Sequence, residues 1–193
     1  MLTKVKNKYP RLKRDFFEQD TLSAAKNLLG QMLIFKNYVG IITETEAYIG
    51  ETDPACHAAR GKTKRTEVMY EKAGLSYIYL IYGMYHCLNF VTEKKDFPAA
   101  VLIRGLYLLE PKIYLDGPGK LCKRLGLDLK SNKTDITKDK KFYLLKTNLN
   151  LNFERTSRIG ISKGKDKEWR FLAQKNELET KITSFLKLYK VKL

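Results

Sequence analysis

The sequence has few of the residues that build disulfides or metal sites. Its three cysteines, Cys56, Cys87 and Cys122, are far apart and odd in number, which is typical of a protein in a reducing compartment. There are two histidines, His57 and His86, and no CxxC or HxxxH spacing. These shortages predict neither a structural zinc site nor an iron–sulfur cluster, and we expect no metal and no other cofactor.

Long apolar runs are missing and acidic residues are scarce. No run reaches the roughly 18 apolar residues of a membrane helix, and the basic start has no apolar signal segment, so we expect no membrane association and no secretion. The chain carries 37 lysines and arginines against 21 acids, a net charge of +16, with a pI near 9.7. Such a pI points to a nucleic-acid partner. An anionic membrane surface and a merely lysine-rich protein are the alternatives.

The chain of 193 residues, 44% of them hydrophobic, is long enough for one domain with a substantial core. Residues 1–11 read as a basic, partly mobile arm. Helical signals predict helices at 22–29, behind an Asp20 cap, and at 176–193, packed on the domain. Strand signals fall in the following ranges: 31–36, 41–50, 76–91, 99–109, 142–146, 158–161 and 168–171.

The chain is organised around the stretch 41–50, IITETEAYIG. Strict alternation predicts a strand with Ile41, Thr43, Thr45 and Ala47 on one face and Ile42, Glu44, Glu46 and Tyr48 on the other. Glutamates on a solvent face are ordinary, whereas in a cleft one of them can serve as a general base. Arg104 interrupts the apolar strand at 99–109, and a buried guanidinium needs an anionic partner. Glu44 and Glu46 are the candidates.

Three basic features are candidates for phosphate contacts or for the site. Asp53-Pro54 predicts the start of a short helix that carries His57, which is either a site residue or a surface histidine with no role. The following loop can wrap a phosphate backbone, although a solvated charge run is the alternative. Its four cations are Arg60, Lys62, Lys64 and Arg65. Lys120, near a predicted helix start, suggests a further phosphate site or simply a capped helix.

Residues 76–91, SYIYLIYGMYHCLNFV, read as a tight hairpin with a type II′ turn at Gly83-Met84. Tyr82 and Tyr85 then flank the tip, where a large ring is hard to bury. Aromatic rings beside basic segments suggest stacking on bases or wedging between base pairs. Asn89, polar within an apolar run, is either a satisfied core amide or a base-reading group.

Taken in order, these motifs resemble the alkyladenine (3-methyladenine) DNA glycosylase family. The motifs that carry the resemblance are ETEAYIG, HAARGKTKR, YIYLIYGMYHCLN, VLIRGL, GPGKLCKRLGL and RIGI…WRF, and they span about 160 residues from Leu12 to Phe171. The pairing of ETEAY with LIYGMYxCLN is far more specific than any single short motif.

The resemblance implies roles for particular residues. Tyr82, with Met84 beside it at the tip, enters the minor groove and takes the place of a flipped nucleotide. The flipped base lies between Tyr48 and Tyr79, with His57 beside them. For the remaining site residues it implies that Glu46 activates the water with help from Arg104, and that Asn89 discriminates against the amino group of guanine.

We therefore predict a single α+β domain with a curved, largely antiparallel sheet, flanking helices and a protruding, DNA-inserting hairpin. The expected activity is that of a monofunctional glycosylase, a monomer without cofactor, that removes alkylated or deaminated purines from duplex DNA in the cytoplasm, at the nucleoid, or in a nucleus. A bifunctional glycosylase with a lysine Schiff base is one alternative. A non-enzymatic protein that only kinks duplex DNA is the other.

Overall fold

The structure is a computed structural model of the chain and describes residues 9–188. The first part of the predicted basic arm, 1–8, lies outside the described residues. So does the end of the predicted terminal helix, 189–193. Within the described part Tyr9 and Leu12 are buried, so the end of the arm packs on the domain instead of extending into solvent.

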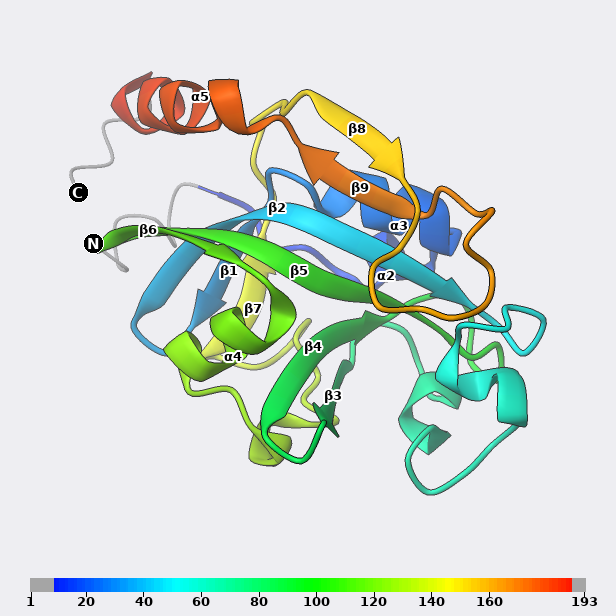
Figure 1. Cartoon of the computed structure of the whole chain (residues 1–193). Helices are drawn as coiled ribbons and strands as arrows, with labels where there is room; N and C mark the ends of the chain where they lie inside the picture. The colour runs from blue at the N-terminus through cyan, green and yellow to red at the C-terminus, as the bar shows by residue number, and fades with distance from the viewer. Residues whose placement is uncertain (1–8, 189–193) are drawn as a thin grey trace.

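One curled antiparallel sheet forms the body of the molecule (Figure 1). Its central path runs β3-β4-β5-β2-β1-β7, with β6 paired to β5, and with β9 paired to both β2 and β8. The strands are β1 (Met32–Phe35), β2 (Tyr38–Ile49), β3 (Ser76–Ile81), β4 (Tyr85–Val91), β5 (Ala99–Leu109), β6 (Lys112–Asp116), β7 (Phe142–Leu145), β8 (Phe153–Thr156) and β9 (Arg170–Ala173). The predicted α+β class with a curved antiparallel sheet is confirmed.

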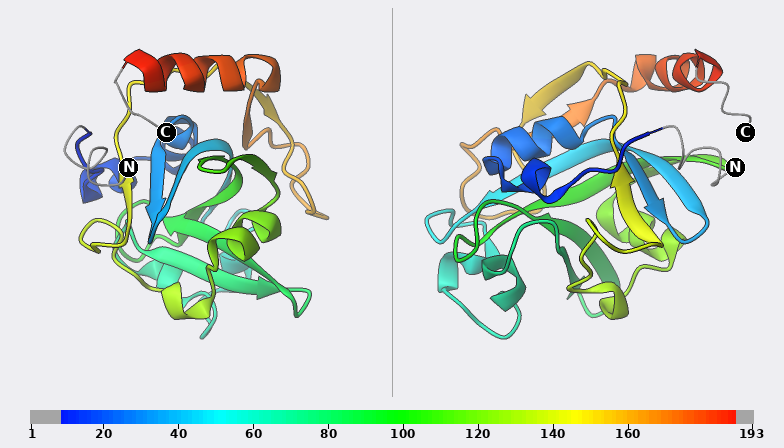
Figure 2. Two further views of the ribbon diagram at one scale, coloured as in Figure 1. Left: turned by 90° about the vertical axis from the view of Figure 1, so that its left-hand side faces the viewer. Right: turned by 180° about the vertical axis from the view of Figure 1, so that it is seen from behind.

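Helices cover the sheet on several sides (Figure 2). They are α2 (Arg14–Glu18), α3 (Thr21–Leu28), α4 (Pro118–Leu125), α5 (Lys175–Leu188) and the 3-10 turns η1 (His57–Arg60), η2 (Glu67–Tyr70) and η3 (Leu129–Ser131). Asp20 caps α3 as predicted, because its carboxylate accepts the Ser23 N–H at 2.9 Å. The apolar side of α5 is buried against β1 and β2, which confirms that this helix packs on the domain.

The central pair β2–β5 holds the site at a break in its register. The pairing shifts between Ile42 and Thr45, where β2 carries a bulge opposite Gly105. A Cβ on Gly105 would lie 2.7 Å from the Glu44 Cβ, so only glycine lets the two strands approach here. The bulge bends β2 over the neighbouring strand at the point where its glutamates begin.

Side-chain contacts confirm the alternation predicted for β2 from Glu44 to Tyr48, but the faces predicted for Ile42 and Thr43 are wrong. The bulge breaks the alternation there, so that Ile42 lies in the same hydrophobic cluster as Ala47 and Thr43 approaches Gly105 from the side of Glu44. Glu44 and Glu46 both contact Arg104, and the Tyr48 hydroxyl donates to Glu46. Thr45 points the other way, since its hydroxyl donates to the Ala25 carbonyl of α3 at 2.8 Å. The glutamate face is not solvent, because Glu44 is 5% and Glu46 0% exposed.

Several predictions about elements are wrong. Residues 158–161 are not a strand; they form an irregular loop, and the strands of this region are β8 and β9. The short helix starts at His57 instead of Pro54, because the Asp53 carboxylate is bound to Arg158 and caps no helix. The sequence analysis also missed α2, β6 and β8, which are short elements with little internal periodicity.

The hairpin turn differs by one residue from the prediction. Met84 N–H donates to the Ile81 carbonyl at 3.2 Å, so Tyr82 and Gly83 are the central pair. Both have positive φ, +53° and +69°, as in a type I′ turn, whereas type II′ needs positive φ only at its first position. A tyrosine in this conformation is strained by about 1–2 kcal/mol.

Candidate active site

A cavity of about 380 Å³ opens between the β3–β4 hairpin, the end of β2 and the loop after β8. Aromatic rings form much of its wall: Tyr48, Tyr77, Tyr79, Tyr82 and Tyr85. The polar groups of the wall come from His57, Asn89 and Arg104. The structure thus brings together all four predicted base-pocket residues, the predicted catalytic arginine and the tip tyrosine. A volume of this order suits one small planar ligand.

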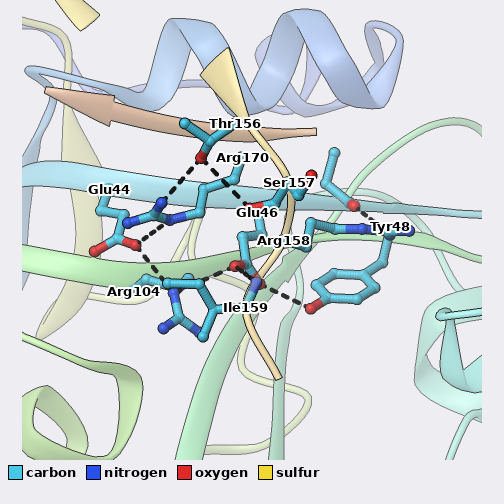
Figure 3. Close-up of polar contacts among 10 residues, drawn as sticks. Glu44, Glu46, Tyr48, Arg104, Thr156, Ser157, Arg158, Ile159 and Arg170 are labelled. Atoms are coloured by element: carbon cyan, nitrogen blue, oxygen red, sulfur yellow. Dashed lines mark hydrogen bonds and ion pairs between the residues drawn. The ribbon is translucent and has the colours of Figure 1, made fainter. Parts of the chain in front are cut away.

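Glu46 lies directly behind the cavity wall. One carboxylate oxygen accepts the Tyr48 hydroxyl at 2.8 Å, and the other accepts the Ile159 N–H at 2.8 Å and lies 3.3 Å from Arg104 Nε (Figure 3). All three partners line the cavity. Burial raises the Glu46 pKa above its ordinary value, against the opposing pull of Arg104 and of the two hydrogen bonds. A carboxylate with a raised pKa near a cavity is suited to proton abstraction.

Glu44 is held away from this role by two arginines. The same oxygen accepts Arg104 Nε at 3.0 Å and Arg170 Nε at 2.6 Å, and Arg170 also donates to the Thr156 hydroxyl (Figure 3). Neither glutamate is itself part of the cavity lining, but only one of the two partners of Glu44, Arg104, lines the cavity. Arg104 therefore contacts both of the carboxylates that the sequence offered as alternative partners, and Glu44 orients it toward Glu46 and the cavity.

The predicted pocket histidine is part of an aromatic cluster and is not a surface residue. His57 Nδ1 lies 2.8 Å from the Tyr77 hydroxyl, and its ring meets Tyr79 edge-on at 4.5 Å. Burial and the nearby charge of Arg65 lower the His57 pKa to about 4, so the imidazole is neutral at pH 7. Tyr77, through its hydroxyl, is thus the residue that orients His57.

Asn89 is a buried, hydrogen-bonded amide, the first of the two readings that the sequence left open, and it also lies at the cavity. It is 3% exposed, and its Nδ2 donates to the backbone carbonyls of Tyr77 at 3.0 Å and Cys87 at 3.5 Å. The residue also lines the cavity. With its nitrogen committed to the hairpin, the amide offers an acceptor oxygen and no donor to a ligand.

The hairpin tip presents apolar side chains to solvent. Tyr82 is 80% and Met84 66% exposed. The flanking cations differ in their contacts. Arg60, Lys62 and Lys64 are exposed, while Arg65 lies over the Tyr79 ring at 4.9 Å. Lys120 is exposed but pairs with Asp116 at 2.8 Å.

Sequence reasoning missed an ion pair behind the cavity. Arg158 and Asp53 have fully buried side chains joined by two hydrogen bonds of 2.5 and 2.8 Å. Arg158 was taken for part of a strand and Asp53 for a helix start. The sequence does contain an indication of this pair, because Arg158 directly precedes the apolar Ile159-Gly-Ile161. A charged side chain beside an apolar run needs an anionic partner, and the same reasoning was applied to Arg104.

The described part of the chain has neither a cluster of metal-binding side chains nor a membrane-spanning helix. Across residues 9–188 no group of three or more His, Cys, Asp or Glu side chains is placed to hold a metal ion. Within the same range no helix has the length and apolar character needed to cross a bilayer.

Comparison with known proteins gives a consistent result. The sequence profile of the methylpurine-DNA glycosylase family matches residues 15–177. A protein of Rickettsia rickettsii named "Putative 3-methyladenine DNA glycosylase" is 52% identical over 96% of this chain and 98% of its own length. Proteins with the same name are 58% identical in a Wolbachia of Brugia malayi, over 83% of this chain and 95% of theirs, and 56% identical in Ehrlichia chaffeensis, over 83% and 92%.

Proposed function

The chain belongs to the methylpurine-DNA glycosylase family, and from this premise we propose that it hydrolyses the N-glycosidic bond of damaged purines flipped out of duplex DNA. The observation that carries the proposal is the buried Glu46 carboxylate, whose Tyr48, Ile159 and Arg104 partners all line an aromatic cavity. A base inside a duplex cannot reach such a cavity, so extrusion must precede the chemistry, at a cost of a few kcal/mol.

The proposed reaction needs a base catalyst and a binding surface for a planar ring. Water attacks the sugar carbon as the bond to the purine nitrogen breaks; the bonding electrons leave with the purine, and Glu46 takes the water proton. Tyr48 and Tyr79 hold the flipped base, and Asn89, on the cavity wall, discriminates against the amino group of guanine. Tyr82, with Met84 beside it, fills the vacated stack.

We propose that purines alkylated on the ring are the favoured substrates. Such a ring is already cationic and leaves as a neutral base. A deaminated purine such as hypoxanthine is neutral and gains from protonation as it leaves. His57 cannot supply this proton as an imidazolium, because burial and Arg65 lower its pKa to about 4 and the ring is neutral at pH 7. Deaminated purines are therefore accepted but released more slowly.

The proposal is tested with Glu46→Gln and its neighbour Glu44→Gln as the matched control. A 3-methyladenine duplex is incubated in single-turnover conditions and the free base is measured. Glu46→Gln should lower the rate by about 10²- to 10⁴-fold, because the amide cannot take the water proton. Duplex binding should stay near that of the wild type. Full activity in Glu46→Gln with an inactive Glu44→Gln would reverse the assignment of the two carboxylates.

The two alternatives give different products. No lysine is among the cavity-lining residues in the described range, which argues against a lysine Schiff base. A covalent adduct trapped by borohydride on a lesion duplex would nevertheless establish one. A protein that only kinks DNA would bind the duplexes and release no base from a panel of 3-methyladenine, 7-methylguanine, hypoxanthine and ethenoadenine.

A further inference from the structure

The Arg158–Asp53 ion pair joins three segments that are far apart in the sequence. Arg158 Nη1 donates to the Ala47 carbonyl of β2 at 2.9 Å as well as to Asp53. The Asp53 oxygens accept the Ile49 N–H at 3.2 Å and the Ala55 N–H at 3.1 Å. The pair thus ties the end of β2, the turn before His57 and the loop after β8 to one another.

Each of the three segments contributes to the cavity wall. Tyr48 comes from β2, Ala55 and His57 from the turn and the 3-10 helix after it, and Ile159 with its two neighbours from the loop. The guanidinium of Arg158 itself does not line the cavity; it lies over the Tyr48 ring at 4.7 Å (Figure 3). The residue after Arg158 supplies the N–H that binds Glu46 at 2.8 Å.

Stability alone is a weak reason for such a pair. Both side chains are fully buried, and the cost of removing two charges from water commonly equals or exceeds their attraction. The loop it anchors has no strand pairing of its own, so its position depends on a few side-chain contacts. Bidentate arginine–carboxylate pairs fix orientation as well as distance.

We propose that Arg158 and Asp53 are positioning residues that set the loop so that the Ile159 N–H meets Glu46 and the Tyr48 ring closes the cavity. The effect of this ion pair on excision rests on the proposed function, whereas its effect on the position of the loop does not. In the free protein the pair holds the loop whether or not the chain excises bases.

The main test removes both charges together, so that neither is left buried without a partner. In Asp53→Asn/Arg158→Met the single amide oxygen still accepts one of the two backbone N–H groups that bind Asp53, and the methionine fills the space. Arg158→Lys keeps the positive charge but loses the bidentate geometry of the guanidinium. If the double variant does not fold, this single variant tests whether the pair positions the loop. The matched control is Asp135→Asn/Arg14→Met, which removes a 2.6 Å ion pair that ties down α2 outside the cavity wall.

The first readout is the pH profile of single-turnover excision. The groups that face Glu46 are the Tyr48 hydroxyl, the Arg104 guanidinium and the Ile159 N–H, with the charges of Glu44 and Arg158 nearby, so Arg158→Lys, which keeps the Arg158 charge, isolates the effect of the loop. Losing the N–H removes a group that stabilises the carboxylate, so the Glu46 pKa rises and the acid limb moves to higher pH. The plateau rate per folded molecule should fall by about 100-fold, the usual effect of a small misplacement. The control variant Asp135→Asn/Arg14→Met should change neither the acid limb nor the plateau rate.

The second readout does not depend on activity. Trp169 is the only tryptophan in the chain, and the Arg158 guanidinium lies 5.0 Å from its ring. Release of the loop should increase acrylamide quenching of Trp169 in both Arg158 variants and not in the control. A wild-type protein that released no base would refute the proposed function while leaving this measurement valid. Folded variants with wild-type quenching, rate and acid limb would overturn the positioning role.

Discussion

At the scale of single residues, the two glutamates of β2 differ in their partners and not in their chemistry. Both touch Arg104, but Glu44 is also bound by Arg170, while Glu46 accepts the Tyr48 hydroxyl and a backbone N–H. Burial raises the Glu46 pKa, and the pKa of the neighbouring Tyr48 is also raised, by burial and by Glu46. The raised pKa of Tyr48 keeps the proton of this hydrogen bond on the tyrosine, which donates it to Glu46.

Tyr48→Phe tests this hydrogen bond without removing the ring. The Tyr48 hydroxyl stabilises ionised Glu46, so its loss should raise the Glu46 pKa and move the acid limb of excision to higher pH. Activity well above that limb should change little. The control is Tyr79→Phe, whose hydroxyl interacts with Cys87 instead. An unmoved acid limb in Tyr48→Phe would show that the hydroxyl does not tune Glu46.

At the scale of elements, the β3–β4 hairpin carries an exposed ring on a strained turn. Tyr82 is 80% exposed and has φ +53°, a conformation that glycine or asparagine would adopt more easily. The exposed Tyr82 ring makes few packing contacts that could offset this backbone strain. Strain of this kind concentrates at functional positions. The hairpin strands themselves are regular, with six paired positions from Ser76 to Ile81.

Tyr82→Ala should lower excision from duplex DNA far more than it lowers stability. Base–aromatic stacking is worth about 1–3 kcal/mol, so the flipping equilibrium should shift by roughly 5- to 150-fold. A buried tyrosine would instead cost about 3–5 kcal/mol of stability. Melting temperature and single-turnover excision are measured on the same sample, with Phe97→Ala, another exposed aromatic, as control. A large loss of melting temperature with unchanged excision would remove Tyr82 from the proposed DNA contact.

At the scale of the whole molecule, the chain has a net charge of +16, and the proposed DNA contacts lie on one side. The basic loop of η1 lies on the side of the hairpin and cavity, whereas α5 crosses the opposite end (Figures 1 and 2). All four cations of this loop are exposed, but Arg65 also lies over the Tyr79 ring of the cavity wall, which leaves Arg60, Lys62 and Lys64 as the cations that can be replaced without disturbing that wall.

Replacing Arg60, Lys62 and Lys64 together with alanine should reduce the salt dependence of duplex binding. Each lost phosphate contact lowers the slope of log affinity against log salt by about 0.9, so up to about three units should disappear. The same number of charges removed from α5, at Lys175, Lys181 and Lys187, should leave the slope unchanged. Equal slopes for the two triple variants would mean that net charge, and not this loop, governs binding.

The sequence by itself determined the features that depend on local periodicity. The β5 boundaries, the Asp20 cap of α3 and the common face of Glu44, Glu46 and Tyr48 all follow from neighbours along the chain. Alternation in a strand needs no knowledge of distant residues, because successive side chains must point to opposite faces. The motif order around these elements also carried the family resemblance.

Only the tertiary structure decided how the two glutamates differ and what holds the cavity together. Arg170 reaches Glu44 from 126 positions away, and Arg158 reaches Asp53 across 105. Residues 158–161 have a strand-like sequence but find no partner strand, so they remain a loop whose backbone binds Glu46. Such contacts depend on which segments the curled sheet brings side by side, and a charged residue in the sequence shows that it needs a partner without showing which one.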